Sequence, residues 1–193
     1  MNIIRYASLK STTGTTGPTR EVAAGPNAQD WDWCISLADA TKAGPLPTMA
    51  GCERMMAVVD GDLIALTVDG SEQALEKYRP FRFSGDAQSS VDLPTGALKV
   101  LHLMTRRGAF KGYAAIIELS KKRPHPVFAE QFAVLLHGSA TVSPPAAGGA
   151  GGADTAGAAP AEGLGKFDTV VGSEEAPEIS GRGFLAVLSI DPA

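Results

Sequence analysis

Short apolar runs that end at glycine, proline or aspartate fill most of the 193-residue sequence. Residues 31–39 alternate between apolar and polar side chains, so Trp33, Ile35 and Leu37 can share one face of an extended segment. A period of two is that of a β-strand. Further strands are expected over residues 2–9, 19–24, 80–83, 97–104, 112–119, 131–137, 167–171 and 183–190. About ten short strands joined by turns predict an all-β barrel or sandwich.

The sequence around Asp60-Gly61 predicts a β-hairpin. Two apolar runs within residues 54–69 flank this dipeptide, and tight hairpin turns favour Asp-Gly because both central residues take a positive φ. Evidence for helix is confined to residues 71–78, where Ser71 could cap a turn or two of good helix formers. We therefore expect a chain with little helix.

Composition narrows the class of protein. The 17 Lys and Arg residues against 21 Asp and Glu give a net charge of −4, which argues against a nucleic-acid-binding surface. No apolar stretch approaches the ~20 residues of a membrane span, and no signal peptide is evident, so we expect a cytoplasmic protein that does not bind membranes. In that compartment Cys34 and Cys52 are expected to be buried free thiols.

One segment has a composition of its own. From Ala146 to Ala161, 13 of 16 residues are alanine or glycine, and the segment follows Pro144-Pro145. Side chains this small bury too little apolar area to offset the entropy of ordering the chain. We expect a flexible loop over about 144–165 inside a single domain that spans 1–193, because the ~30 residues after it are too few to form a second domain.

Patterns of catalytic residues are weak. The three histidines, His102, His125 and His137, include no pair spaced two apart on one strand, the spacing that metal-binding barrels commonly use. Neither a metal nor another cofactor is therefore expected. The sequence has no G-x-S-x-G nucleophile elbow, and neither cysteine has a neighbourhood typical of a reactive thiolate.

Two other features leave alternatives open. The Thr- and Gly-rich residues 11–19 lack the Lys-Ser/Thr of a phosphate-binding loop, so they form either a plain turn or a loop whose N–H groups and hydroxyls hold a small anion. Arg106-Arg107 ends a predicted strand and forms either surface salt bridges or a clamp for a carboxylate. Arg54 has the same two interpretations.

Five short motifs follow one another along most of the chain. They are TTGTTGPTRE ending at Glu21, and residues 32–38, 44–54, 83–86 and 100–108. In this order they resemble motifs of the HutD/Ves family of bacterial cupin-like proteins. No single motif is decisive, but five in order are fairly specific.

The resemblance implies an all-β, cupin-type β-barrel (a double-stranded β-helix), with the bicupin-like variant in which both halves of the chain contribute barrel-like sheets. It also implies a link to histidine utilisation. Family members are thought to bind a small carboxylate of that pathway, such as urocanate or formylglutamate, and to restrain pathway expression without catalysing a step. If the chain forms an oligomer, we expect it to be a homodimer.

The chain departs from the family motifs where a ligand would bind. The family has Trp, Asn, Arg, Asp and Asn at the positions that are here Thr12, Gly14, Cys34, Val100 and His102. The fold implied by the resemblance is unaffected, but the loss of several polar groups changes the hydrogen bonds that a pocket can offer. The identity of the ligand therefore does not carry over.

Glu21, Arg54, His102 and Met104 are the residues expected to form a ligand pocket. Arg54 would pair with a ligand carboxylate. His102 would replace the family amide, and a change of its charge near pH 6.5 would make binding sensitive to pH.

Two alternatives to a binding protein remain. One is a cupin-class enzyme, such as an isomerase or lyase, with His102 as base and Glu21 as acid. The other is a structural protein without a ligand site.

Overall fold

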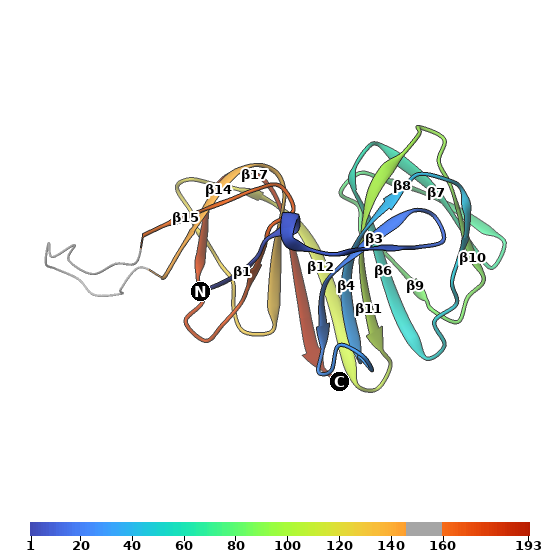
Figure 1. Ribbon diagram of the computed structural model, residues 1–193, viewed down its shortest axis with the longest axis horizontal. Coiled ribbons are helices and arrows are strands. Elements are labelled where there is room, and N and C mark those ends of the chain that lie inside the picture. The colour runs from blue at the N-terminus through green and yellow to red at the C-terminus, as the bar shows by residue number, and fades with distance from the viewer. Residues whose placement is uncertain (146–159) are drawn as a thin grey trace, which may run out of the picture. The chain divides into compact units, whose positions relative to one another are not determined.

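The described residues, 1–145 and 160–193 of a computed structural model, form short strands joined by turns (Figure 1). Their helix is limited to one three-residue 3-10 turn, η1 (Tyr6–Ser8), and none of their helical segments could cross a membrane. The loop expected over 144–165 falls largely on residues 146–159, outside the described residues. Within its expected range, Glu162–Leu164 forms strand β15 and pairs with β14.

The chain divides into two compact units. The central unit comprises residues 8–116 and 188–193, and the terminal unit comprises residues 1–7 and 117–187. Strands β12 (Phe110–Leu119) and β17 (Glu178–Pro192) contribute residues to both units. The single domain over 1–193 stays a prediction.

Two antiparallel sheets build the central unit. One is a six-stranded sheet of order β2-β3-β4-β11-β6-β9, of which Figure 1 labels β3, β4, β11, β6 and β9. The bounds of its strands are Ser11–Thr13, Pro18–Gly25, Trp33–Ala40, Leu98–Arg106, Cys52–Asp60 and Phe81–Ser84. The second sheet has the order β5-β10-β7-β8, with bounds Gly44–Leu46, Ser89–Asp92, Leu63–Val68 and Ser71–Glu76.

The core of the central unit lies between these two sheets. Val100 on β11 pairs with Ala38 on β4 and with Val58 on β6, and both valines are almost fully buried. The second sheet adds Ile64 and Leu66, which are also fully buried, to the same cluster. Removal of these side chains from water is the main force that holds the two sheets together.

The hairpin predicted at Asp60-Gly61 is wrong, because β6 pairs with β11 and β9 whereas β7 pairs with β10 and β8. Asp60-Gly61 instead carries the chain from one sheet to the other. The Asp-Gly hairpin lies nine residues later, at Asp69-Gly70, where φ values of 47° and 81° are those of a two-residue hairpin turn. A turn signal predicts that the chain reverses but not which strands pair.

The turn or two of helix predicted over residues 71–78 is also wrong. Ser71–Glu76 is strand β8, which pairs residue by residue with β7. Leu75 lies opposite Ile64 and is 4% exposed. Burial of Leu75 against the sheet outweighs the modest helix preference of its neighbours, which amounts to tenths of a kcal/mol per residue.

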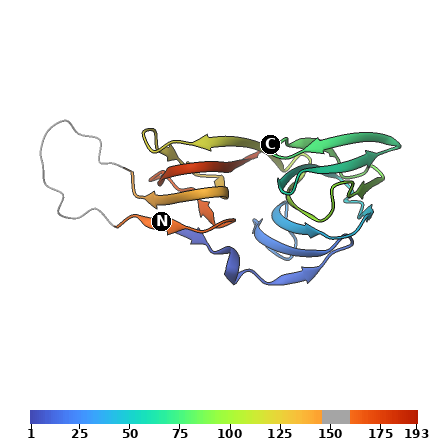
Figure 2. The ribbon, with the colours of Figure 1, turned by 90° about the horizontal axis from the view of Figure 1, so that it is seen from above.

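The terminal unit is built on a sheet of order β1-β16-β14-β17-β12, with β13 paired to β17 and β15 paired to β14. Figure 2 shows the blue N-terminal strand β1 beside the orange strand β16, in agreement with their pairing. The remaining bounds are Asn2–Ile4 for β1, His125–Pro126 for β13, Gln131–Ser143 for β14 and Thr169–Val171 for β16.

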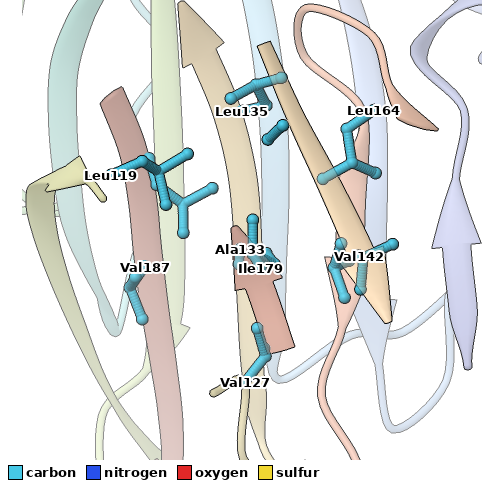
Figure 3. Packing of buried hydrophobic residues seen from close by; sticks show 11 residues of the cluster. Leu119, Val127, Ala133, Leu135, Val142, Leu164, Ile179 and Val187 are labelled. Carbon is cyan, nitrogen blue, oxygen red and sulfur yellow. The ribbon is translucent and has the colours of Figure 1, made fainter. Parts of the chain in front are cut away.

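Aliphatic side chains fill the interior of the terminal unit. Leu135, Ile179 and Leu185 are fully buried there, and Figure 3 shows Leu135 and Ile179 within a cluster that contains only carbon atoms in its side chains. Asp168, 6% exposed, ties the N-terminal segment to this unit because it accepts hydrogen bonds from the Tyr6 N–H at 2.9 Å and from Arg5 Nη1 at 2.6 Å.

Truncation in this core should destabilise the protein. We expect Leu135→Ala to lower the free energy of unfolding by about 2–5 kcal/mol, because it leaves a cavity at a fully buried position. Urea unfolding followed by fluorescence measures this change. Phe128→Ala is the matched control at a side chain that is 56% exposed, and it should change the free energy by no more than about 0.5 kcal/mol. Equal losses in the two variants would contradict the assigned core.

Candidate ligand-binding cavity

A cavity of about 140 Å³ lies within the central unit and is lined by strands and by two connecting segments. The strands contribute Thr19 from β3, Ser36 and Ala38 from β4, Arg54 from β6, and His102 and Met104 from β11. The connecting segments contribute Gly14, Thr15 and Thr16 before β3, and Leu46, Pro47 and Met49 at the end of β5 and after it.

The register of the sheet determines which side chains meet in this cavity. His102 pairs with Ser36 on β4, and Met104 pairs with Arg54 on β6. Because side chains alternate along a strand, His102 and Met104 lie on the same face of β11 as the buried Val100. The cavity therefore continues the interior of the central unit, with polar groups in place of aliphatic ones.

Arg54 is a buried cation without a carboxylate partner among the described residues. Arg54 is only 4% exposed, and it forms no ion pair with another described residue. Nη1 donates a hydrogen bond of 2.8 Å to the Pro47 carbonyl, the guanidinium lies 5.2 Å from the centre of the Phe83 ring, and Nε has no hydrogen-bond partner. Burial lowers the pKa of Arg54. A buried guanidinium with spare donors is a site for an anion.

His102 lies beside this cation in the cavity wall. Burial, and then repulsion by Arg54, lowers the pKa of His102 to about 3. The expectation that the imidazole changes its charge near pH 6.5 is therefore wrong for the empty cavity, because enclosure by protein and a neighbouring positive charge both disfavour the imidazolium. At neutral pH the ring is uncharged and offers one hydrogen-bond donor and one acceptor.

Three of the four predicted site residues meet at the cavity and one does not. Arg54, His102 and Met104 all line it, whereas Glu21 is exposed and is not among the lining residues. Glu21 Oε2 lies 3.9 Å from Sγ of Cys34, and burial together with this carboxylate raises the pKa of the Cys34 thiol to about 12. Both cysteines are free and buried, as predicted.

The threonine-rich segment forms one wall of the cavity, which the interpretation of this segment as a plain turn does not predict. The Thr16 carbonyl accepts hydrogen bonds from the N–H groups of Thr41 at 2.9 Å and Lys42 at 3.2 Å, which fix the segment. Gly17 has a φ of 153°, and a β-carbon there would lie 1.9 Å from the Asp39 carbonyl oxygen. Only glycine permits this approach, which holds the threonines against the cavity.

The segment between β5 and β6 forms the opposite wall and is fastened by residues of the resemblance motifs. The Met49 N–H donates to the Gly85 carbonyl at 2.8 Å, and the Gly51 N–H donates to Asp86 Oδ1 at 2.9 Å. Asp86 also forms an ion pair with Arg107, and these contacts, the ion pair first, lower the pKa of Asp86 to about 2. Asp86 therefore fixes the segment that supplies the Pro47 carbonyl to Arg54.

Arg106 and Arg107 are surface cations held by carboxylates. Arg106 Nε lies 2.6 Å from Asp32 Oδ1, and Arg107 Nη1 lies 3.1 Å from Glu53 Oε1. The first of the two interpretations, surface salt bridges, is therefore correct for both. Sequence reasoning did not place Ser36, Ala38, Leu46, Pro47 or Met49 in the site, although all five line the cavity. The pairing of Ser36 with His102 is the signal that brings Ser36 to it.

Two further observations concern other kinds of site. A groove of about 820 Å³ over Leu63 and Ala74 is larger than the cavity, but its charged side chains, Lys42, Glu72 and Asp92, are all exposed. Among residues 1–145 and 160–193, no three His, Cys, Asp or Glu side chains come together as a metal site would require.

Comparison with known proteins gives matches of two kinds. A family model described as HutD matches residues 13–186. An uncharacterized 21.2 kDa protein in the hutC 3′ region of Pseudomonas putida is 34% identical over 91 residues, which cover 46% of this chain and 48% of that protein. Protein Ves of Citrobacter koseri is 30% identical over 105 residues, 53% of this chain and 55% of that protein. The chain thus matches about half the length of these curated relatives.

Solved structures give the fold. The structure of HutD from Pseudomonas fluorescens (formate condition) has a TM-score of 0.76 and 21% identity and covers all of this chain and 98% of that chain. A cupin 2 conserved barrel domain protein from Leptotrichia buccalis has a TM-score of 0.60 at 12% identity and covers all of this chain and 96% of that chain. The prediction of an all-β, cupin-type fold is confirmed.

Removal of the Asp86 carboxylate should loosen the cavity wall. We expect Asp86→Ala to speed amide hydrogen exchange at Gly51 by roughly tenfold, because the N–H loses a charged acceptor. Exchange measured residue by residue by NMR tests this. Asp92→Ala is the control at an exposed carboxylate of β10 and should leave Gly51 unchanged. Unaltered exchange at Gly51 in Asp86→Ala would contradict the assigned role.

His102 should make the protein less stable in acid. The folded pKa of about 3 lies below the ordinary value near 6.5, so the unfolded chain binds more protons than the folded one between these values. Stability due to the neutral ring is therefore complete above pH 6.5 and is lost as the pH falls toward 3. Melting temperatures should fall less between pH 7 and pH 4 in His102→Asn than in the wild type, whereas His137→Asn, at an exposed histidine, should match the wild type.

Proposed function

The chain belongs to the HutD family, and we propose that it binds a small anionic metabolite in the cavity at Arg54 without catalysing its conversion. The observation that carries this proposal is the buried guanidinium with no carboxylate among the described residues to neutralise it. Isolated buried charges are costly, and proteins normally pair them. A ligand anion is the partner that completes this site.

The size and charge of the cavity favour a small monocarboxylate. A volume of about 140 Å³ is close to that of an engineered cavity that holds benzene and is below the usual range for larger ligands. One cation suits one carboxylate, and the threonine hydroxyls and the neutral His102 ring can bond to polar atoms of the ligand. Of the two ligands that the family resemblance implies, urocanate, with its single carboxylate and flat ring, fits these features better than formylglutamate, which has two carboxylates.

The placement of Glu21 favours a binding protein over an enzyme. An acid–base mechanism with His102 and Glu21 requires both groups within reach of one ligand. His102 lines the cavity, but Glu21 is exposed and lies beside Cys34. A purely structural protein is disfavoured as well, because the hydrogen bond to Pro47 and the Phe83 ring leave the buried charge of Arg54 without a carboxylate among the described residues.

We also tie the ligand to histidine utilisation. This part of the proposal rests on the relatives: one is named HutD, and another is described by its place in the hutC 3′ region. Restraint of that pathway through binding of one of its acids is the role that follows. It is separable from the binding site itself, since Arg54 would bind small carboxylates of any origin.

A thermal-shift titration with urocanate and with formate tests the site. We expect millimolar carboxylate to raise the melting temperature of the wild type by several degrees, because a ligand at 100 times its Kd adds about 2.7 kcal/mol of stability. Arg54→Met removes the charge and keeps a long side chain, so it should abolish the shift. Arg106→Met, at an arginine paired with Asp32 on the surface, should retain it. Equal shifts in Arg54→Met and the wild type, or no shift in the wild type with either acid, would overturn the proposal.

A further inference from the structure

We infer that binding of a carboxylate in this cavity is coupled to the uptake of a proton at His102, so that the site holds its anion more tightly as the pH falls below neutral. The inference rests on the proposed function, because it concerns the same cavity. It adds to Arg54 a second positive charge, the protonated His102 ring, which forms when the ligand binds. His102 is a position at which the chain differs from the family motif.

The geometry places both groups around one small space. Arg54 on β6 lies opposite Met104 on β11, and His102 is two residues away from Met104 on the same face of β11. All three side chains line a cavity of about 140 Å³. An anion that accepts hydrogen bonds from Arg54 inside so small a volume is also within a few ångströms of the imidazole.

The other elements around His102 bring no carboxylate into the cavity wall. The segment before β3 contributes backbone and threonine hydroxyls, and the segment after β5 contributes apolar groups and the Pro47 carbonyl. The neighbouring strand β4 contributes Ser36, whereas its Cys34 and the exposed Glu21 of β3 lie outside the lining. Among the described residues of the lining, Arg54 is thus the charged group that acts on His102.

A bound carboxylate offsets the repulsion that Arg54 exerts on a charged His102 ring. In the empty cavity, burial and Arg54 both oppose the imidazolium, and the pKa of His102 is lowered to about 3. A carboxylate within about 4–6 Å favours the charged ring and raises a pKa by about 1–3 units. With ligand bound, His102 therefore titrates between roughly pH 4 and pH 6.

Proton linkage then fixes how affinity depends on pH. When the pKa of a group is higher in the complex than in the free protein, binding takes up protons and strengthens as the pH falls through the higher value. Above pH 7 the ring is neutral in both states and the affinity is constant. Between pH 7.5 and pH 5.0 we expect the affinity for a carboxylate that stays ionised to increase about twofold when the bound-state pKa of His102 is near 5, and about tenfold when it is near 6.

Calorimetric titration of formate into the full-length protein tests the coupling. Titrations at pH 7.5 and pH 5.0, each in two buffers of different ionisation enthalpy, give the Kd and the number of protons taken up. The wild type should bind more tightly at pH 5.0 and should take up part of a proton there and none at pH 7.5. His102→Asn restores the family amide and should bind formate with the same Kd at both pH values and with no proton uptake. His137→Asn, at an exposed histidine outside the cavity, should behave as the wild type.

The outcomes separate the coupling from the proposed function. Formate binding without proton uptake at pH 5.0, or an undiminished pH dependence in His102→Asn, would overturn the coupling and leave anion binding at Arg54 intact. Absence of formate binding to the wild type at both pH values would overturn both. Circular dichroism at each pH checks that every variant is folded, and His102→Gln serves as a second amide variant where His102→Asn fails to fold.

Discussion

The pairing of β11 with β4 on one side and with β6 on the other is the interaction on which the rest of the central unit depends. The same register that brings Val100 against Ala38 and Val58 in the core also brings His102 beside Ser36. Side chains alternate strictly along a strand, so a slip of one residue would turn the whole inner face outward. Burial of Val100 and its aliphatic neighbours therefore also fixes the position of His102 on the same strand. The contacts that form the core thus place the side chains of the cavity.

Sequence reasoning predicted the fold and part of the site. Alternation along residues 31–39 marks β4 correctly, because a period of two is visible in the sequence itself, and the strand expected over 97–104 is β11. The hairpin was assigned to the wrong Asp-Gly pair, since strand partners depend on contacts between distant segments. Glu21 was predicted in the pocket on the basis of motif order, but the structure leaves it exposed. Its strand has a bulge just after this residue, which no pattern in the sequence reveals.

The two compact units are both built from β-strands, but their interiors differ in composition. In the terminal unit, leucine, isoleucine and valine fill the interior, as Figure 3 shows. In the central unit a comparable aliphatic cluster occupies part of the interior, and the cavity with Arg54 and His102 occupies another. Surface ion pairs, such as Asp86 with Arg107, then hold the wall of that cavity in place. Within the described residues, the candidate cavity thus lies in the unit whose aliphatic cluster fills only part of the interior.

The unpartnered Nε of Arg54 has a consequence for how long the protein survives in a cell. A chain with an empty cavity retains a buried charge and a buried donor without a hydrogen-bond partner, and each lowers its resistance to opening. Occupancy by an anion relieves both. Because proteases act on opened chains, an anion bound as proposed would slow the degradation of the protein. The proposed site would in this way couple the level of a metabolite to the abundance of the protein that binds it.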